Sequence, residues 1–572
     1  MVLVHIEISC EELHQIMKTY QYTKLVAALA AVGMVGVAGA QAVTSSIAVN
    51  PDGVGQALIY PFYSVQNGNA TLLSVVNTTG EGKVVKIRFR DYANSEDVRD
   101  FNIYLSAKDV WTAAVLPVGS AGMTGSGGWT GTAAGGAMVV TQDNTCTAPN
   151  KTNWQDVSAD FSGIPTYAVP FSKSDYVAHD NATRGSAADQ TIERTTRGYF
   201  EVIEQATIPT STTMYSKVDH RVAGRNGKPD CAGLHALSPS VNSTYNWSAH
   251  SLTQQSGGLF GSVAWLSLGN GASTATSAVA MNGFARNSLV YNAGDFQPNF
   301  TDHNTTTAVV TTTDRVVIAN FASSVSIPSG VSAQVANMWA ATAPFFATNV
   351  QGEYFYSNDL AGATDWVITM PGKRHFVTFA GSGADAAGDA YAPSASTTLP
   401  PFANSSYWRT AAGTGQYTSP VPLGAVSYDR EEATFTAPGC LFSPCDRLTI
   451  ETNALPHESN VIAFGPTGQP TSAPSGALNA NNSLWLLGQL QTPTVGGGWL
   501  DLSFSSTRPV VGSVVGGVLL NSGIALTPGS NNTTFNGLPV IGFQVNSAKS
   551  ISPGVRDNYR HSSNLAIKKS VQ

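Results

Sequence analysis

The chain has 572 residues, several times what one hydrophobic core needs, so we expect about two to four domains. Hydrophobic residues make up 42% of it but charged residues only 12%, about half of the usual share for a globular protein. The formal net charge is −7, and no run of Lys or Arg forms a basic stripe, which argues against nucleic acid as a partner.

Residues 17–40 are typical of a Sec signal peptide. Two lysines precede an apolar run, Leu25–Val37, which ends in Ala38-Gly39-Ala40. The run is short for a bilayer span, and a small-x-small triplet is the usual cleavage site. A second such triplet lies two residues further on, so we expect the mature chain to begin at Gln41 or Val43. We expect export to the extracellular space, the cell surface or the periplasm, with no transmembrane segment after cleavage.

Residues 1–16 do not fit this pattern, because they carry three Glu ahead of the basic segment. We therefore expect translation to begin at Met17, with a genuine sixteen-residue extension as the alternative. In either case Cys10 is absent from the mature chain.

The clearest strand pattern lies in residues 55–116. In Val84–Arg90, apolar side chains alternate with Lys86, Arg88 and Arg90. Successive side chains of a strand point to opposite faces, so this pattern predicts a half-buried strand with a basic face in water. The other strands predicted in this region are Ala57–Val65, Thr71–Asn77, Phe101–Leu105 and Val110–Val115. Short strands with polar turns favour an antiparallel β-sandwich of immunoglobulin type.

Further strands are predicted downstream, at Tyr199–Ile208, Ser262–Leu268, Arg315–Phe321 and Trp485–Leu490. Trp366–Met370 and His375–Phe379 flank Pro371-Gly372-Lys373, which predicts a hairpin. Leu500, Leu502 and Phe504 share one face of a strand, opposite Trp499. No stretch after the signal keeps a helical period for more than about three turns, so we expect a mainly β body with long irregular loops.

The Thr-rich stretch Thr301–Thr313 is the best candidate for a hinge between two halves. We therefore expect an N-terminal β-sandwich region at 41–300 and a C-terminal β-rich region at 301–572. Gly119–Thr132 and Gly381–Pro401 have the composition of loops.

The mature chain keeps four cysteines, Cys146, Cys231, Cys440 and Cys445. An even number in an oxidising compartment favours disulfides. Cys440 and Cys445 can close a small loop, which leaves Cys146 to pair with Cys231. The alternative is a zinc site built from Cys231, His235, Cys440 and Cys445. Export weighs against free thiolates, so we expect two disulfides and no metal.

Candidate catalytic groups are few. The densest charge cluster is Asp429-Arg430-Glu431-Glu432, but adjacent residues on a strand point to opposite faces, and glycosidases need two carboxylates that face each other. Asp365 beside Trp366, and His457 beside Glu458, are isolated acids and bases that are more often structural. Gly381–Ala386 imitates a dinucleotide-binding loop but lacks the helix that such a loop requires. We therefore expect no catalytic residue and no cofactor.

Several segments together resemble a family of exported, β-rich Gram-negative proteins of unassigned function. These segments are Gly55–Tyr63, Leu73–Thr79, Asp100–Leu105 with Val110-Trp111, Thr364–Val367, Asp429–Glu432 and Phe535–Gly542. The resemblance covers most of the mature chain and is densest over residues 50–115. It implies export and β-architecture, and it implies no catalytic residues.

Three functions remain open: a non-enzymatic surface or extracellular structural or adhesion-type protein, a secreted glycan- or polymer-binding protein, and a secreted hydrolase with an unrecognised site. Low charge and the absence of catalytic motifs favour the first. Self-association or attachment to the cell envelope is then expected, through strand edges that another chain can extend. Lys86, Arg88 and Arg90 are expected to protect one such edge.

Overall fold

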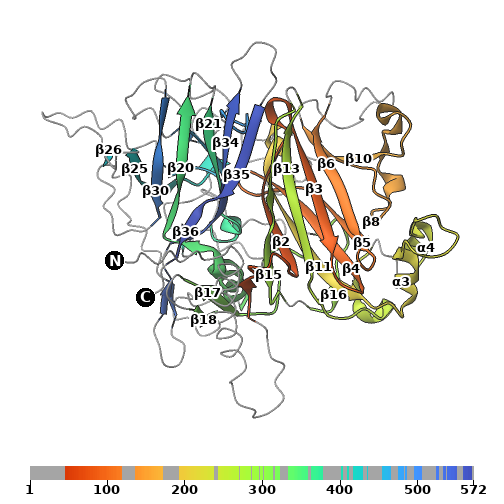
Figure 1. The fold of residues 1–572 in the computed structure, drawn as a ribbon. Coiled ribbons are helices and arrows are strands. Elements are labelled where there is room, and N and C mark those ends of the chain that lie inside the picture. Colours follow the sequence, from red (N-terminus) through yellow and green to blue (C-terminus); the bar gives the residue numbers. More distant parts are fainter. Residues whose placement is uncertain are drawn as a thin grey trace, which may run out of the picture.

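The computed structural model describes residues 46–118, 136–171, 192–237, 243–268, 271–284, 287–295, 297–300, 302–312, 316–321, 333–357 and 362–377. Beyond these it describes residues 401–402, 409–410, 417–429, 434–435, 454–464, 475–481, 484–485, 495–504, 524–526, 533–535, 537–549 and 558–569. The described chain forms two β-sandwiches that lie side by side (Figure 1).

The first sandwich comprises two seven-stranded sheets, here sheets I and II, in which all strand pairs are antiparallel. Sheet I has the order β1 (Ala48–Val49), β15 (Val279–Asn282), β2 (Ala57–Ser64), β11 (Arg197–Ile208), β4 (Gly82–Asp91), β5 (Asp97–Leu105) and β8 (Cys146–Ala148). Sheet II has the order β14 (Ser273–Ser277), β13 (Leu259–Ser267), β3 (Asn69–Asn77), β6 (Val110–Pro117), β7 (Ala137–Thr141), β10 (Tyr167–Pro170) and β9 (Gln155–Asp156).

Sheets I and II pack face to face over an apolar core, because one face of each strand is apolar. In β13, Leu259, Val263 and Trp265 are buried in this core, whereas Phe260 and Ser262 are exposed on the other side of the sheet. The prediction of a mainly β, antiparallel sandwich is confirmed. The immunoglobulin-type arrangement of its strands stays a prediction.

Sheet I is covered on its second face as well. The helices α3 (Thr213–Val218) and α4 (Cys231–His235) pack there, and Met214 and Leu234 join Val84 and Tyr104 in one buried cluster. All ten residues of β4 are therefore buried. The short sheet of β12 (Tyr245–Asn246) and β16 (Leu289–Val290) lies beside this layer.

The predicted basic face of Val84–Arg90 in water is wrong, because Lys86 and Arg88 are only 1% exposed. The predicted alternation of side chains between the two faces of this strand is correct. It does not reveal, however, whether water or another layer of the protein covers each face. The expected protection of a sheet edge by these residues is also wrong, because β4 pairs with β11 on one side and with β5 on the other.

The second sandwich comprises two five-stranded sheets, here sheets III and IV. Sheet III has the order β26 (Thr434–Phe435), β25 (Gly424–Asp429), β30 (Val495–Ser503), β20 (Asn349–Ser357) and β36 (Ala566–Lys568). Sheet IV has the order β29 (Leu484–Trp485), β28 (Ser459–Phe464), β21 (Ala363–Thr369), β34 (Ile541–Lys549) and β35 (Asn558–Asn564), with only the β28–β29 pair parallel among these strands. The predicted face of Leu500, Leu502 and Phe504 is confirmed, since all three are buried and Trp499 is exposed.

The central strand of sheet IV, β21, is buried on both faces. Trp366 and Ile368 of β21 point into the core shared with sheet III, whereas Ala363 and Val367 point into the core of the first sandwich. The Thr369 hydroxyl donates a hydrogen bond to the Pro61 carbonyl of β2 at 2.7 Å. The two sandwiches therefore share continuous apolar packing.

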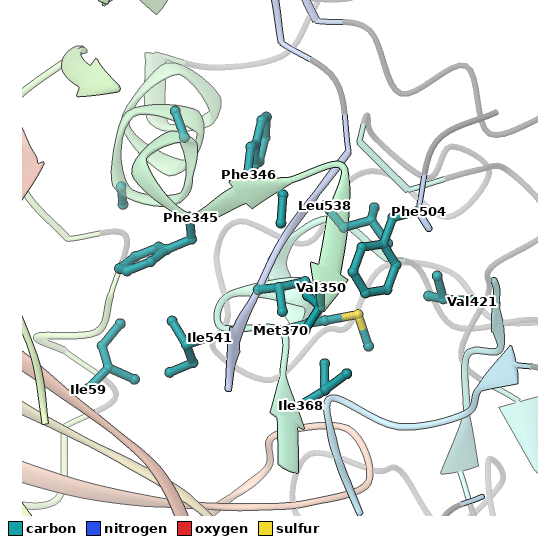
Figure 2. Close-up of a cluster of buried hydrophobic side chains, with 14 of the residues drawn as sticks. Ile59, Phe345, Phe346, Val350, Ile368, Met370, Val421, Phe504, Leu538 and Ile541 are labelled. Atoms are coloured by element: carbon teal, nitrogen blue, oxygen red, sulfur yellow. The ribbon is translucent and has the colours of Figure 1, made fainter. Parts of the chain in front are cut away.

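β2 also contributes to the core of the second sandwich. Figure 2 shows Ile59 on the same side of this cluster as Ile541 and Phe345. Phe504, Val421 and Leu538 lie on its other side (Figure 2). Side chains far apart in the sequence thus meet in one buried cluster.

Shorter elements complete the described chain. Next come the antiparallel pair β17 (Thr307–Thr311) and β18 (Val316–Asn320) and the helix α5 (Ala333–Thr342). In Figure 1, β17 and β18 lie below the second sandwich, beside the lower end of the first. Residues 301–313, the expected hinge, therefore include a strand. The other short pairs are β19 (Phe346–Ala347) with β33 (Leu538–Pro539), β22 (Arg409–Thr410) with β23 (Tyr417–Thr418), β24 (Val421–Pro422) with β27 (Ala454–Leu455), and β31 (Ile524–Leu526) with β32 (Thr533–Phe535). Within the described ranges, no helix is long and apolar enough to cross a membrane.

The predicted hairpin around Pro371-Gly372-Lys373 is wrong. β21 pairs with β28 and β34 instead, and the 3-10 helix Lys373–His375 follows it. Gly372 has φ +79, a conformation that glycine adopts without strain, and it begins this helix. The turn signal at Pro371-Gly372-Lys373 marks the end of β21 but not a hairpin. Both edges of β21 are already paired with β28 and β34, so the segment that follows the turn cannot pair with it.

Candidate functional site

One predicted disulfide is present. Cys146 at the start of β8 is bonded to Cys231 at the start of α4, with 5.2 Å between their Cα atoms. The bond ties the helical layer to the edge of sheet I. Because the sulfur of Cys231 is used in this bond, it is not available as a zinc thiolate. The Nε2 atom of His235 lies 2.8 Å from the Thr147 carbonyl oxygen. Cys440 and Cys445 lie outside the described residues.

The charged side chains Lys83, Lys86 and Arg88 of β4 are buried and paired with acids. Lys83 and Glu204 of β11 form a fully buried ion pair with an Nζ–Oε1 distance of 2.8 Å. Glu204 also accepts hydrogen bonds from the backbone N–H groups of Ser256 and Gly257. Its lone pairs are thus satisfied without water, which is the usual condition for a buried carboxylate.

Lys86 and Arg88 share acidic partners on β5. The Lys86 ammonium lies 2.8 Å from the Asp100 carboxylate, and the Arg88 guanidinium lies 3.1 Å from both Asp97 and Asp100. Burial lowers the pKa of Lys86 to about 8, although Asp100 opposes this shift. Both cations also donate to backbone carbonyls of a later segment, Lys86 to Asn292 at 3.1 Å and Arg88 to Asp295 at 2.8 Å, so that segment covers them and they do not face water.

A second group of charges joins the two sandwiches. Arg374, from the 3-10 helix after β21, pairs with Glu96 at 2.8 Å. The Tyr199 hydroxyl of β11 donates to Glu458 at 2.8 Å, and Glu458 also accepts from the backbone N–H of Arg374. We call Glu96, Tyr199, Lys373, Arg374, His457 and Glu458 the junction cluster.

The junction cluster has shifted proton affinities. Burial raises the pKa of the Glu458 carboxyl. Burial lowers the pKa of Lys373 to about 7, and its ammonium donates to the Ser419 carbonyl at 2.6 Å. Burial, together with Arg197, Lys373 and Arg194, holds the pKa of His457 well below its usual range.

Shifted pKa values are common in active sites, but they also arise in structural ion-pair networks. Lys373 and Glu458 have no exposed surface, and His457 and Arg374 are nearly as deeply buried. A general acid or base must reach its substrate, directly or through one water molecule. The junction cluster is therefore a buried network of hydrogen bonds and ion pairs that connects the two sandwiches.

The other isolated acid, Asp365 of β21, is also structural. Its carboxylate accepts hydrogen bonds from the backbone N–H groups of Ala477 at 3.0 Å and Leu478 at 2.5 Å. Burial raises its pKa to about 6. Of the acidic run, Asp429 ends β25 and Glu431 and Glu432 lie outside the described residues, as does the loop Gly381–Ala386. No group of three or more His, Cys, Asp or Glu that could hold a metal ion lies within the described residues.

The exposed side of sheet II has the opposite character. Its outward residues lie on four adjacent strands: Ser273, Ala275 and Ser277 on β14; Phe260, Ser262, Ala264 and Leu266 on β13; Leu72, Ser74 and Val76 on β3; and Val110, Thr112, Ala114 and Leu116 on β6. We call this set the sheet II outer face. It contains no charged residue, and Leu72 is 44%, Val110 46% and Phe260 41% exposed.

A groove crosses one side of this face. It has a volume of about 490 Å³ and lies between the strand residues Leu72, Ser74 and Ala114 and the side chains of Gln142 and Phe161. Its size falls within the usual range for ligand pockets. Hydroxyl, amide and apolar groups line it.

The sequence reasoning missed this face, although a signal was present. The strands β3, β6, β13 and β14 contain no charged residue at any position, neither on the buried nor on the outward side. Half-buried antiparallel strands normally carry polar or charged side chains on the side in water. A charge-free outward side therefore distinguishes these strands from an ordinary solvated sheet.

Comparison with known proteins returns no match: no family model fits the chain, and neither a curated protein nor a solved structure is similar to it.

Proposed function

We propose that this chain is an exported, non-enzymatic surface protein that adheres or assembles through the sheet II outer face. The observation that carries the proposal is the contrast between the two sides of the first sandwich. The side of sheet I bears the charges and is covered, whereas the side of sheet II is uncharged and exposed. The largest exposed uncharged patches of monomeric proteins are often functional surfaces.

Three further features support the proposal. The signal-like segment and the family resemblance favour export. The Cys146–Cys231 bond is of a kind that persists in oxidising compartments. The acid and base residues singled out in the sequence, Asp365, His457 and Glu458, are buried in structural contacts. Catalysis by them would require a route for substrate into the sandwich junction.

The groove beside Phe161 favours a second candidate function, the binding of an uncharged glycan or polymer. Hydroxyl and amide groups such as Ser74, Thr112 and Gln142 line it together with apolar groups. A neutral, partly apolar chain fits this lining better than a charged one. Both functions place the contact on the same face.

Fractionation of the producing cells tests the proposal. We expect the protein in the envelope or in the medium, with an intact mass that begins at Gln41 or Val43. Washing with about 1 M salt should leave the attached protein in place, because screening weakens contacts between charges but not contacts between uncharged groups. Cytoplasmic protein that retains residues 17–40 would contradict the proposal.

A further inference from the structure

The residues of the sheet II outer face form rows across the strands. Ser277, Ser262, Ser74 and Thr112 are neighbours in register, so four hydroxyls lie in one row. The Ser74 and Ser262 hydroxyl oxygens are 3.2 Å apart. The next row is Ala275, Ala264, Leu72 and Ala114, and Phe260, Val76 and Val110 lie on the other side of the hydroxyls.

This composition is complementary to itself. A hydroxyl both donates and accepts hydrogen bonds, so a row of hydroxyls can bond to a copy of the same row. A row of charges of one sign cannot do this. The flanking rows of small and apolar side chains can pack on their own copies in the same way.

Electrostatics also favour a second copy of this chain as the partner of the face. The whole chain carries a net charge of −7, so two copies repel each other where their charged surfaces meet. Contact through the sheet II outer face brings no pair of like charges together. Charged groups lie at the borders of the face. At β6 the carboxylates of Asp143 and Asp109 accept from the backbone N–H groups of Thr112 at 3.0 Å and Val110 at 2.9 Å, and beside β14 the Arg560 guanidinium lies 3.5 Å from the Ala272 carbonyl oxygen.

The size of the face is sufficient for a weak dimer. Four strands at about 4.8 Å each span about 19 Å, and strands the length of β6 span about 27 Å. The face thus offers about 500 Å² per copy, and two facing copies bury about 1,000 Å². This is close to the lower limit of specific interfaces, which indicates reversible association.

We propose that the sheet II outer face binds a second copy of this chain, face to face. This inference deepens the proposed function and rests on it. Because the same patch faces itself, the contact is isologous, as in most symmetric homodimers. The groove beside Phe161 is then filled by side chains of the second copy.

Analytical ultracentrifugation of the mature chain, purified with its disulfide intact, tests the inference. We expect the wild type to dimerise reversibly between about 1 and 100 µM, with little change in about 1 M salt. Leu72→Glu, in the middle of the face, should weaken dimerisation at least about tenfold, because two carboxylates enter one apolar interface. Leu72→Lys should weaken dimerisation to a similar extent. It serves as a second test in case Leu72→Glu does not fold.

Val316→Glu on β18 is the matched control, because Val316 is also an exposed apolar strand residue, 47% exposed, but lies outside the face. It should dimerise like the wild type. A wild type that stays monomeric throughout, or equal effects of Leu72→Glu and Val316→Glu, would overturn the inference. If the monomeric wild type still binds envelopes or a glycan through Leu72, the partner is not a second copy, and the proposed function stands.

Discussion

Trp265 of β13 stacks on Phe543 of β34, with ring centroids 4.6 Å apart and an interplanar angle of 10°. The two residues belong to different sandwiches, and both are buried. An aromatic pair of this kind stabilises packing beyond the area that it buries. The pair therefore couples the stability of one sandwich to that of the other.

Replacing Trp265 with Ala should reduce the free energy of unfolding by about 3–5 kcal/mol, because it leaves a cavity between the sandwiches. Urea unfolding followed by circular dichroism measures this change. Trp499→Ala is the matched control: Trp499 stacks on Tyr428 but is 38% exposed, so a smaller loss is expected. Equal losses in the two variants would contradict the role of the Trp265–Phe543 pair.

Lys83→Met should destabilise the protein by about 3–5 kcal/mol at neutral pH, because it leaves the carboxylate of Glu204 buried without its cation. The same unfolding measurement applies. Lys217→Met is the control, because the Lys217–Asp230 pair is partly exposed and should contribute less than about 1 kcal/mol. A loss in Lys83→Met no larger than in the control would show that the buried pair adds nothing.

Asp365 predicts a specific dependence of stability on pH. Its pKa is raised from 3.8 to about 6 by burial, although the hydrogen bond from the Leu478 backbone opposes the shift, so the folded state holds the proton more tightly than the unfolded chain. The free energy of unfolding should therefore fall by about 3 kcal/mol from this group as the pH rises from about 4 to about 6, and then level off.

Asp365→Asn should remove that component of the pH dependence, because the amide does not titrate. Asp52→Asn, at an exposed position, should leave it unchanged. Unfolding curves at several pH values between about 4 and 7 measure the effect. A slope unchanged by Asp365→Asn would mean that another group dominates this pH range.

Removing the Cys146–Cys231 bond with Cys146→Ala and Cys231→Ala should cost up to about 4–5 kcal/mol, because the bond closes a loop with a sequence separation of 85 residues. Thermal unfolding measures the loss. In a Cys440→Ala/Cys445→Ala variant, a reductant should cause the same loss. Insensitivity of that variant to reductant would contradict a stabilising role for the bond.

The sequence predicted much of the strand content, because period-two alternation is a local property. β2, β3, β6, β11 and β13 lie within a few residues of the predicted strands. The second face of β4 could not be predicted in the same way. Its Lys86 and Arg88 resemble a solvated face. Their acidic partner Asp100 lies on the next strand, but the backbone carbonyls that cover them, such as those of Asn292 and Asp295, come from a segment about two hundred residues later.

The junction cluster was beyond local reasoning for a related reason. His457 and Glu458 look isolated in the sequence. The partners of Glu458, Tyr199 and Arg374, and the aromatic neighbour of His457, Tyr92, lie far away along the chain. The sheet II outer face is different, because its signal, four strands without charge, was present in the sequence. That signal has no meaning until the strands are known to be neighbours in one sheet.

The most direct test is the location in producing cells of the wild type, Leu72→Glu and Val316→Glu. We expect the wild type and Val316→Glu outside the cytoplasm, in a surface fraction that pellets after washing with about 1 M salt. Leu72→Glu should be exported equally well but released into the soluble fraction. Wild-type protein retained in the cytoplasm, or equal retention of both variants on the surface, would contradict an exported protein that assembles through the sheet II outer face.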